Sequence, residues 1–137
     1  MRPADALLRT AVLTQGVYYV ATGMWSLVNM RSFERVTGPK IDKWLVKTVG
    51  VLVTSIGGAL LVAATRRRIS PEARVLAAGT AMGLAAIDVY YVAKRRIAPV
   101  YLLDAVTELA LLSPAAITTD GLAAKHEPGR ESVAAGR

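Results

Sequence analysis

Apolar residues along the chain form four long blocks, and short clusters of charged residues separate one block from the next. This pattern predicts helices over about 6–30, 43–65, 71–93 and 99–118. Each block is close to the length of about 20 residues that a helix needs to cross the hydrocarbon core of a bilayer. The sequence therefore predicts an all-α fold, an integral membrane four-helix bundle, with one transmembrane domain over residues 1–119 and a polar, disordered tail over 120–137.

The first block contains an uncharged run from Thr10 to Met30, which as a helix would be about 31 Å long. A cleaved signal peptide is the alternative interpretation, but its apolar core would be shorter and would end in a small-x-small site. Here the run continues through Tyr18 and Trp25. We therefore expect a retained transmembrane helix in this part of the chain.

The second block distinguishes a membrane protein from a soluble four-helix bundle. Each helix of a soluble bundle needs one polar face. Between Lys47 and Arg66 the block contains no charged residue, so it has no such face. Trp44 lies at its start, where aromatic side chains anchor helices at the bilayer interface. The pattern therefore favours a membrane protein.

Local signals mark one helix start and one turn. The tripeptide Ser70-Pro71-Glu72 is typical of a helix start, with the serine as the cap and the proline at the first position. Gly38-Pro39 predicts a turn in the longest connection, which runs over Arg31–Lys43. Within this connection, Ser32–Arg35 is compatible with a short helix at the membrane interface.

Glycines in the second and third blocks indicate where helices pack closely. Helices in membranes approach most closely at small residues. The third block contains a small-x-x-x-small pattern, although such a match is common by chance in an Ala-rich helix. The glycines interpreted as helix-packing positions are Gly50, Gly57, Gly58, Gly79 and Gly83.

Polar residues inside the predicted spans are the candidates for chemistry. Asp104 and Glu108 are four residues apart, so on a helix they share one face. Ionisable groups within a bilayer are costly and usually point toward protein or water. Glu108 lies further from the helix start and is the stronger functional candidate. The polar intramembrane candidates are Gln15, Tyr18, Lys47, Asp88, Asp104 and Glu108.

The charge balance of this set leaves two interpretations open. Lys47 lies near a helix end, where its side chain either extends to the headgroups or pairs with an acid of the fourth block. One cation against three acids leaves at least two carboxyls that need a proton, water or a bound cation. A proton- or cation-coupled carrier has this property. A structural network or a solvated helix end has it as well.

Composition excludes several kinds of site. The chain has no cysteine, and its single histidine, His126, lies in the polar tail. A haem held by two histidines of one chain is therefore impossible, and we predict no metal site and no cofactor. The formal charge is +7, but the basic residues lie at the ends of apolar blocks, where they anchor helices to headgroups. We therefore expect no nucleic-acid partner.

The orientation in the membrane is weakly specified. Nine lysine and arginine residues would lie on the side of the N-terminus and eight on the other side. The positive-inside rule then gives little preference. The dense cluster Arg66-Arg67-Arg68 favours both termini in the cytoplasm, and dual insertion stays open.

The segment Thr37–Gly50 reads Thr-Gly-Pro-Lys-Ile-Asp-Lys-Trp-Leu-Val-Lys-Thr-Val-Gly. It resembles a group of uncharacterised small four-helix bacterial membrane proteins, and it covers about a tenth of the chain. The size and hairpin layout of the chain are also similar to the DoxX-like group. The resemblance implies a four-helix bundle of the inner membrane without a defined activity. DoxX-like proteins are associated with redox or stress roles, but the absence of cysteine gives redox chemistry no support here.

These observations leave three hypotheses for function. The first is a proton- or cation-coupled transporter of small solutes or a channel-like protein. The second is a non-catalytic scaffold or accessory subunit, and the third is a membrane enzyme acting on a lipid-soluble substrate. The sequence contains no nucleophile-base-acid set and no phosphate-binding glycine loop, which disfavours an enzyme. The expected partners are the lipid bilayer and either a second copy of the chain or a larger membrane protein.

Overall fold

The structure, a computed structural model, describes the backbone of residues 2–123 and the side chains of residues 2–113. Within this range the protein is all-helical, which confirms the all-α part of the predicted fold class. The predicted tail over 120–137 lies largely outside the described residues, and the last helix continues beyond its predicted end at residue 118. The helices are α1 (Pro3–Val28), α2 (Met30–Thr37), α3 (Lys43–Ala64), α4 (Pro71–Ala93) and α5 (Tyr101–Ala123).

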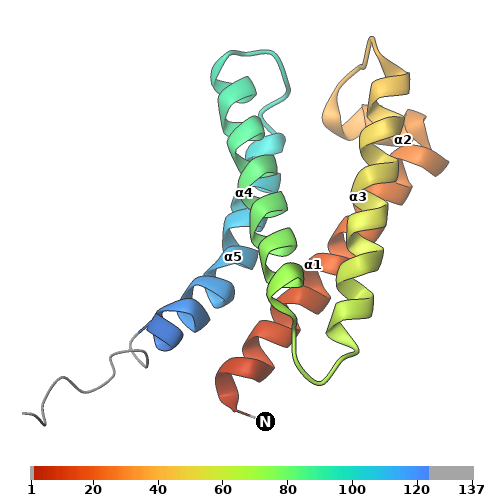
Figure 1. Cartoon of the computed structure of the whole chain (residues 1–137). Helices are drawn as coiled ribbons and strands as arrows, with labels where there is room; N and C mark the ends of the chain where they lie inside the picture. Colours follow the sequence, from red (N-terminus) through yellow and green to blue (C-terminus); the bar gives the residue numbers. More distant parts are fainter. Residues whose placement is uncertain (1, 124–137) are drawn as a thin grey trace, which may run out of the picture.

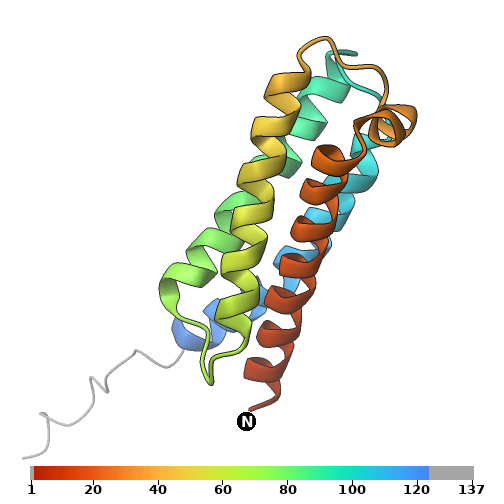
Figure 2. The ribbon, with the colours of Figure 1, turned by 90° about the vertical axis from the view of Figure 1, so that its right-hand side faces the viewer.

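The four long helices run alternately up and down, and they form two antiparallel pairs (Figures 1 and 2). In one pair α1 packs against α3, and in the other α4 packs against α5. Contacts between α1 and α5 join the two pairs, whereas α3 and α4 touch only sparsely although they are consecutive. Helix α1 therefore lies between its partner α3 and the polar residues of the second pair.

Glycines explain the close approach of α1 and α3. Gly16 lies against Gly57, and Gly23 lies against Gly50, so that two glycine pairs recur along the interface. A Cβ atom at Gly57 would lie 2.8 Å from the carbonyl oxygen of Gly16. The two backbones are therefore in direct contact, because neither glycine has a side chain to separate them. By contrast, a Cβ atom at Gly58, Gly79 or Gly83 would meet no neighbouring atom within 4 Å.

Helix α4 begins where the sequence predicts. Ser70 is the N-cap residue, and its hydroxyl accepts a hydrogen bond of 3.3 Å from the backbone N–H of Ala73. Pro71 occupies the first helical position, where its missing N–H costs no hydrogen bond. This cap fixes the start of the helix that carries Asp88 near its other end.

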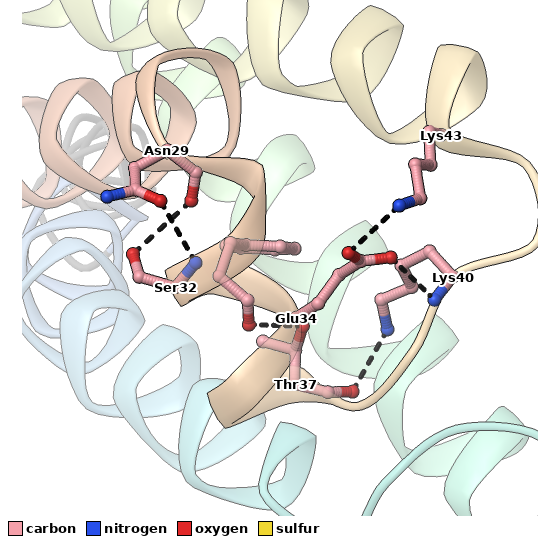
Figure 3. Close-up of polar contacts among 7 residues, drawn as sticks. Asn29, Ser32, Glu34, Thr37, Lys40 and Lys43 are labelled. Atoms are coloured by element: carbon pink, nitrogen blue, oxygen red, sulfur yellow. Dashed lines mark hydrogen bonds and ion pairs between the residues drawn. The ribbon is translucent and has the colours of Figure 1, made fainter.

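The connection between α1 and α3 contains the short helix α2, which lies across one end of the bundle (Figure 1). Figure 3 shows its polar contacts, in which the carboxylate of Glu34 accepts hydrogen bonds from the backbone N–H of Lys40 at 3.0 Å and from Nζ of Lys43 at 3.1 Å. On the other side of α2, the side chain of Asn29 accepts a hydrogen bond from the backbone N–H of Ser32 at 3.0 Å. These contacts hold α2 against the start of α3.

Low pH should loosen this connection. The hydrogen bond from Lys40, reinforced by Lys43, lowers the pKa of Glu34 below its ordinary value of 4.5. A group with a lowered pKa stabilises the fold above its ordinary value, and this contribution is lost as the pH falls through the folded-state pKa. We therefore expect the hydrogen-exchange protection factor of the Lys40 amide to fall as the pH is lowered below about 4.5.

The control for this prediction is a pair of variants in the same connection. Glu34→Gln should reduce protection of the Lys40 amide at neutral pH and remove its dependence on acid pH. Asp42→Asn changes an exposed acid nearby and should leave the protection factor unchanged. A Lys40 amide whose protection does not vary with pH in the native protein would contradict the prediction.

Two helices in the described part of the chain, α3 and α4, are long and apolar enough to cross a membrane. Only 17% of the apolar stretch of α3 and 22% of that of α4 is buried inside the protein. The core helix of a soluble protein would be mostly buried. The exposed large apolar side chains on these two helices include Leu45, Val49, Val51, Leu52, Val62, Val75, Leu76, Met82, Ile87 and Val89.

Candidate functional site

Two adjacent tyrosines of α1 form the centre of a polar cluster in the interior of the helix assembly. The hydroxyl of Tyr19 donates a hydrogen bond of 2.8 Å to Oε2 of Glu108 on α5. The hydroxyl of Tyr18 donates a hydrogen bond to Oδ1 of Asp104, one helical turn earlier on α5. Tyr19 is 1% exposed and Glu108 is 0% exposed, so both partners of this contact are buried. The register between α1 and α5 therefore brings each tyrosine to one carboxyl group.

Gln15 extends this contact to α4. It lies four residues before Tyr19, so the two side chains share one face of α1. Its Nε2 donates to the hydroxyl of Tyr19 at 3.0 Å and to the carbonyl oxygen of Ala77 on α4 at 2.9 Å. The buried amide therefore orients the Tyr19 hydroxyl toward Glu108, because an oxygen that accepts from Gln15 is free to donate its own proton onward.

Asp88 brings a third carboxyl group to the cluster. It is buried on α4 and lies close to Asp104 on α5. The cluster therefore holds one carboxyl group from α4 beside two from α5.

Two oxygen atoms of the cluster lack a partner. Oδ2 of Asp88 and Oε1 of Glu108 are buried and make no hydrogen bond. Buried polar atoms are nearly always hydrogen-bonded to protein or to ordered water, so each exception needs an explanation. Both of these atoms belong to acids, and both belong to the same three-helix cluster.

No basic side chain compensates the three acids within the described part of the chain. The ion pairs found there join Arg2 with Asp5 and Lys43 with Glu34, far from the cluster. Lys47 is exposed on α3 and forms neither an ion pair nor a hydrogen bond with these acids. Burying an unpaired carboxylate is costly, and such a group usually neutralises by taking up a proton or a cation.

The arrangement suits a proton better than a metal ion. The described residues contain no group of three or more acidic, histidine or cysteine side chains placed to hold a metal ion. Asp104 and Glu108 are instead each hydrogen-bonded to a tyrosine, which leaves them spread along α5. The cluster therefore brings together three carboxyl groups and two hydroxyl donors, which is a chemistry that suits proton binding.

Five of the six polar candidates predicted from the sequence lie together here: Gln15, Tyr18, Asp88, Asp104 and Glu108. Lys47 lies apart from them. Sequence reasoning missed Tyr19, the residue that donates to Glu108. Its spacing of four residues from Gln15 was the available signal, because that spacing places both side chains on one helix face.

No protein-family model, curated protein or solved structure matches the chain.

Proposed function

We propose that this chain is a multi-pass protein of the cell membrane that transports a small solute in a proton- or cation-coupled manner. The proton site is the cluster of Asp88, Asp104 and Glu108 between α1, α4 and α5. The observation that carries the proposal is the presence of two buried carboxyl oxygens without a partner, on acids that no described cation compensates. A coupled carrier needs acids whose charge is balanced by the ion that it moves.

Four spans are part of this proposal. Helices α1 and α5 contain more polar residues than α3 and α4, but each packs along one of these apolar helices. Asp104 and Glu108 of α5 point inward, whereas the exposed side chains of this helix include Leu102, Leu103, Val106 and Leu109. A helix with an apolar outer surface and inward acids can lie in lipid, because ionisable groups in membranes face the protein interior. We propose that both termini are cytoplasmic.

The experiment that tests the proposal follows the carboxyl band of Glu108 by infrared spectroscopy on protein in lipid. We expect this band to shift in heavy water and to titrate within the pH range where the fold is retained. Glu108→Gln identifies the band by removing it. A Glu108 carboxyl that neither exchanges its proton with water nor titrates would contradict a transport role and indicate a sealed structural network.

A scaffold that supports a larger membrane partner is the second candidate. The observation that favours it is the open outer surface of α4, where Gly79 and Gly83 have no neighbouring atom within 4 Å of an added Cβ atom. Small residues of this kind allow a second helix to approach closely. Cross-linking from cysteines placed at these two positions to a co-purifying membrane protein would favour the scaffold over the transporter.

A further inference from the structure

A groove between α3 and α4 is a second feature of the molecule, separate from the acid cluster. Its volume is about 410 Å³, which is within the range common for small-molecule sites. The lining is apolar over most of its length and polar at one end, where the two helices are connected. The lining residues are Ala59, Leu60, Val62, Ala63, Ala73 and Leu76, with Arg66, Ser70 and Glu72 at the polar end.

The arrangement of the helices keeps this groove open. Helices α3 and α4 touch only sparsely, because α3 packs on α1 and α4 packs on α5 (Figure 1). Leu60, which is 0% exposed, also belongs to the apolar core, so the groove reaches that core. The exposed large apolar side chains Val62 and Leu76 lie along its borders. The groove is therefore open at its side to an apolar chain, over about two helical turns between Ala59 and Arg66.

The polar end of the groove carries excess positive charge. Arg66 lines it, and the adjacent Arg67 and Arg68 are exposed. Arg66 forms no ion pair within the described residues. The one acid, Glu72, lies in the first turn of α4, where the positive end of the helix dipole stabilises its carboxylate. Arginine binds phosphate through several parallel hydrogen bonds, so Arg66 is available for an anionic group.

From this geometry we infer that the groove binds an anionic phospholipid. Its phosphate would contact Arg66, and one acyl chain would lie along Leu60, Ala63 and Leu76. Basic clusters at the ends of membrane helices attract anionic lipids, and here the cluster leads directly into an apolar groove of the same two helices. The inference rests on the membrane location in the proposed function, but it does not depend on transport.

The experiment is native mass spectrometry of the full-length chain after reconstitution into vesicles of phosphatidylglycerol and phosphatidylcholine with identical acyl chains. We expect retention of phosphatidylglycerol over phosphatidylcholine. Arg66→Gln should reduce this preference about fivefold, as expected for one arginine at the membrane surface. Ala63→Phe, which fills the groove without changing charge, should also reduce it. Inorganic phosphate should not displace the lipid, because it lacks the acyl chain.

Arg67→Gln is the matched control, because it removes the same charge from a position that does not line the groove. Equal losses for Arg66→Gln and Arg67→Gln would overturn the site and indicate diffuse attraction to the membrane surface. Equal retention of the two lipids, or an unchanged preference in Ala63→Phe, would also overturn it. A chain that fails to enter vesicles at all would contradict the membrane location. Failure of the proposed function can therefore be distinguished from failure of the lipid site.

Discussion

Gly57→Ala should destabilise the protein by about 1–3 kcal/mol, the usual cost of overpacking a tight contact. An added Cβ atom would lie 2.8 Å from the carbonyl oxygen of Gly16, 2.8 Å from the backbone nitrogen of Val20 and 2.9 Å from Cβ of Tyr19. All three atoms belong to the backbone or to the base of a side chain, so no rotamer change can relieve the overlap. Helix α1 would have to move as a whole, and Tyr19 would move with it.

The adjacent glycine provides the control. An added Cβ atom at Gly58 meets nothing within 4 Å. Because alanine favours a helix over glycine by up to about 1 kcal/mol, Gly58→Ala should be neutral or stabilising. The free energy of unfolding of both variants, measured by reversible unfolding in mild detergent, checks the prediction. Equal stability of the two variants would show that α1 and α3 are less closely packed than the structure indicates.

The same measurement extends to the outer surface of α4. Gly83→Ala should also be neutral, because that surface is open in the isolated chain. If the variant keeps its stability but loses a co-purifying membrane protein, the scaffold function gains support. If the variant keeps both its stability and the co-purifying protein, the open surface of α4 faces lipid.

Much of the helical architecture follows from the sequence. Blocks of uncharged residues between basic clusters predicted the four long helices, and the tripeptide beginning at Ser70 predicted the start of α4. These signals are local, since a cap or an apolar run acts within one or two helical turns. The partners of the helices could not be predicted in this way. The sequence gives no reason to distinguish Gly50, Gly58 and Gly83, since each is a glycine within an apolar helix. The pairing of α1 with α3 places Gly50 in a helix contact, whereas Gly58 and Gly83 have no neighbouring atom within 4 Å of an added Cβ atom.

At the candidate site, too, local signals could be read from the sequence whereas contacts between helices could not. Acids inside apolar blocks were recognised because their charge is anomalous there. Their partners required the register between helices, which places Tyr19 against Glu108 across 89 residues of sequence. For Lys47 the sequence left two alternatives, extension to the headgroups or an ion pair with an acid, and the packing of α3 on α1 leaves its side chain exposed and without an ion pair. Spacing along one helix therefore predicts shared faces, whereas contacts between helices depend on how the helices pack.

Glu108 should be the acid whose removal has the largest effect on both fold and function. Glu108→Ala leaves the buried Tyr19 hydroxyl without its acceptor, and an unsatisfied buried group costs about 1–3 kcal/mol. It also opens a cavity at a residue that is 0% exposed. Asp104 is only partly buried, so water can replace it as a partner of Tyr18. We therefore expect Glu108→Ala to lower the thermal midpoint in detergent more than Asp104→Ala.

Glu108→Gln separates the structural role of this residue from its chemistry. The glutamine keeps an oxygen that can accept from Tyr19 at nearly the same position, and it removes a carboxyl group whose second oxygen has no partner. Its stability should therefore stay within about 1 kcal/mol of the native protein, the net value of one hydrogen bond. An amide cannot titrate, so solute-induced proton release from the purified protein should be lost. A Glu108→Gln variant that still releases protons when a solute binds would assign coupling to the other two acids of the cluster, Asp88 and Asp104.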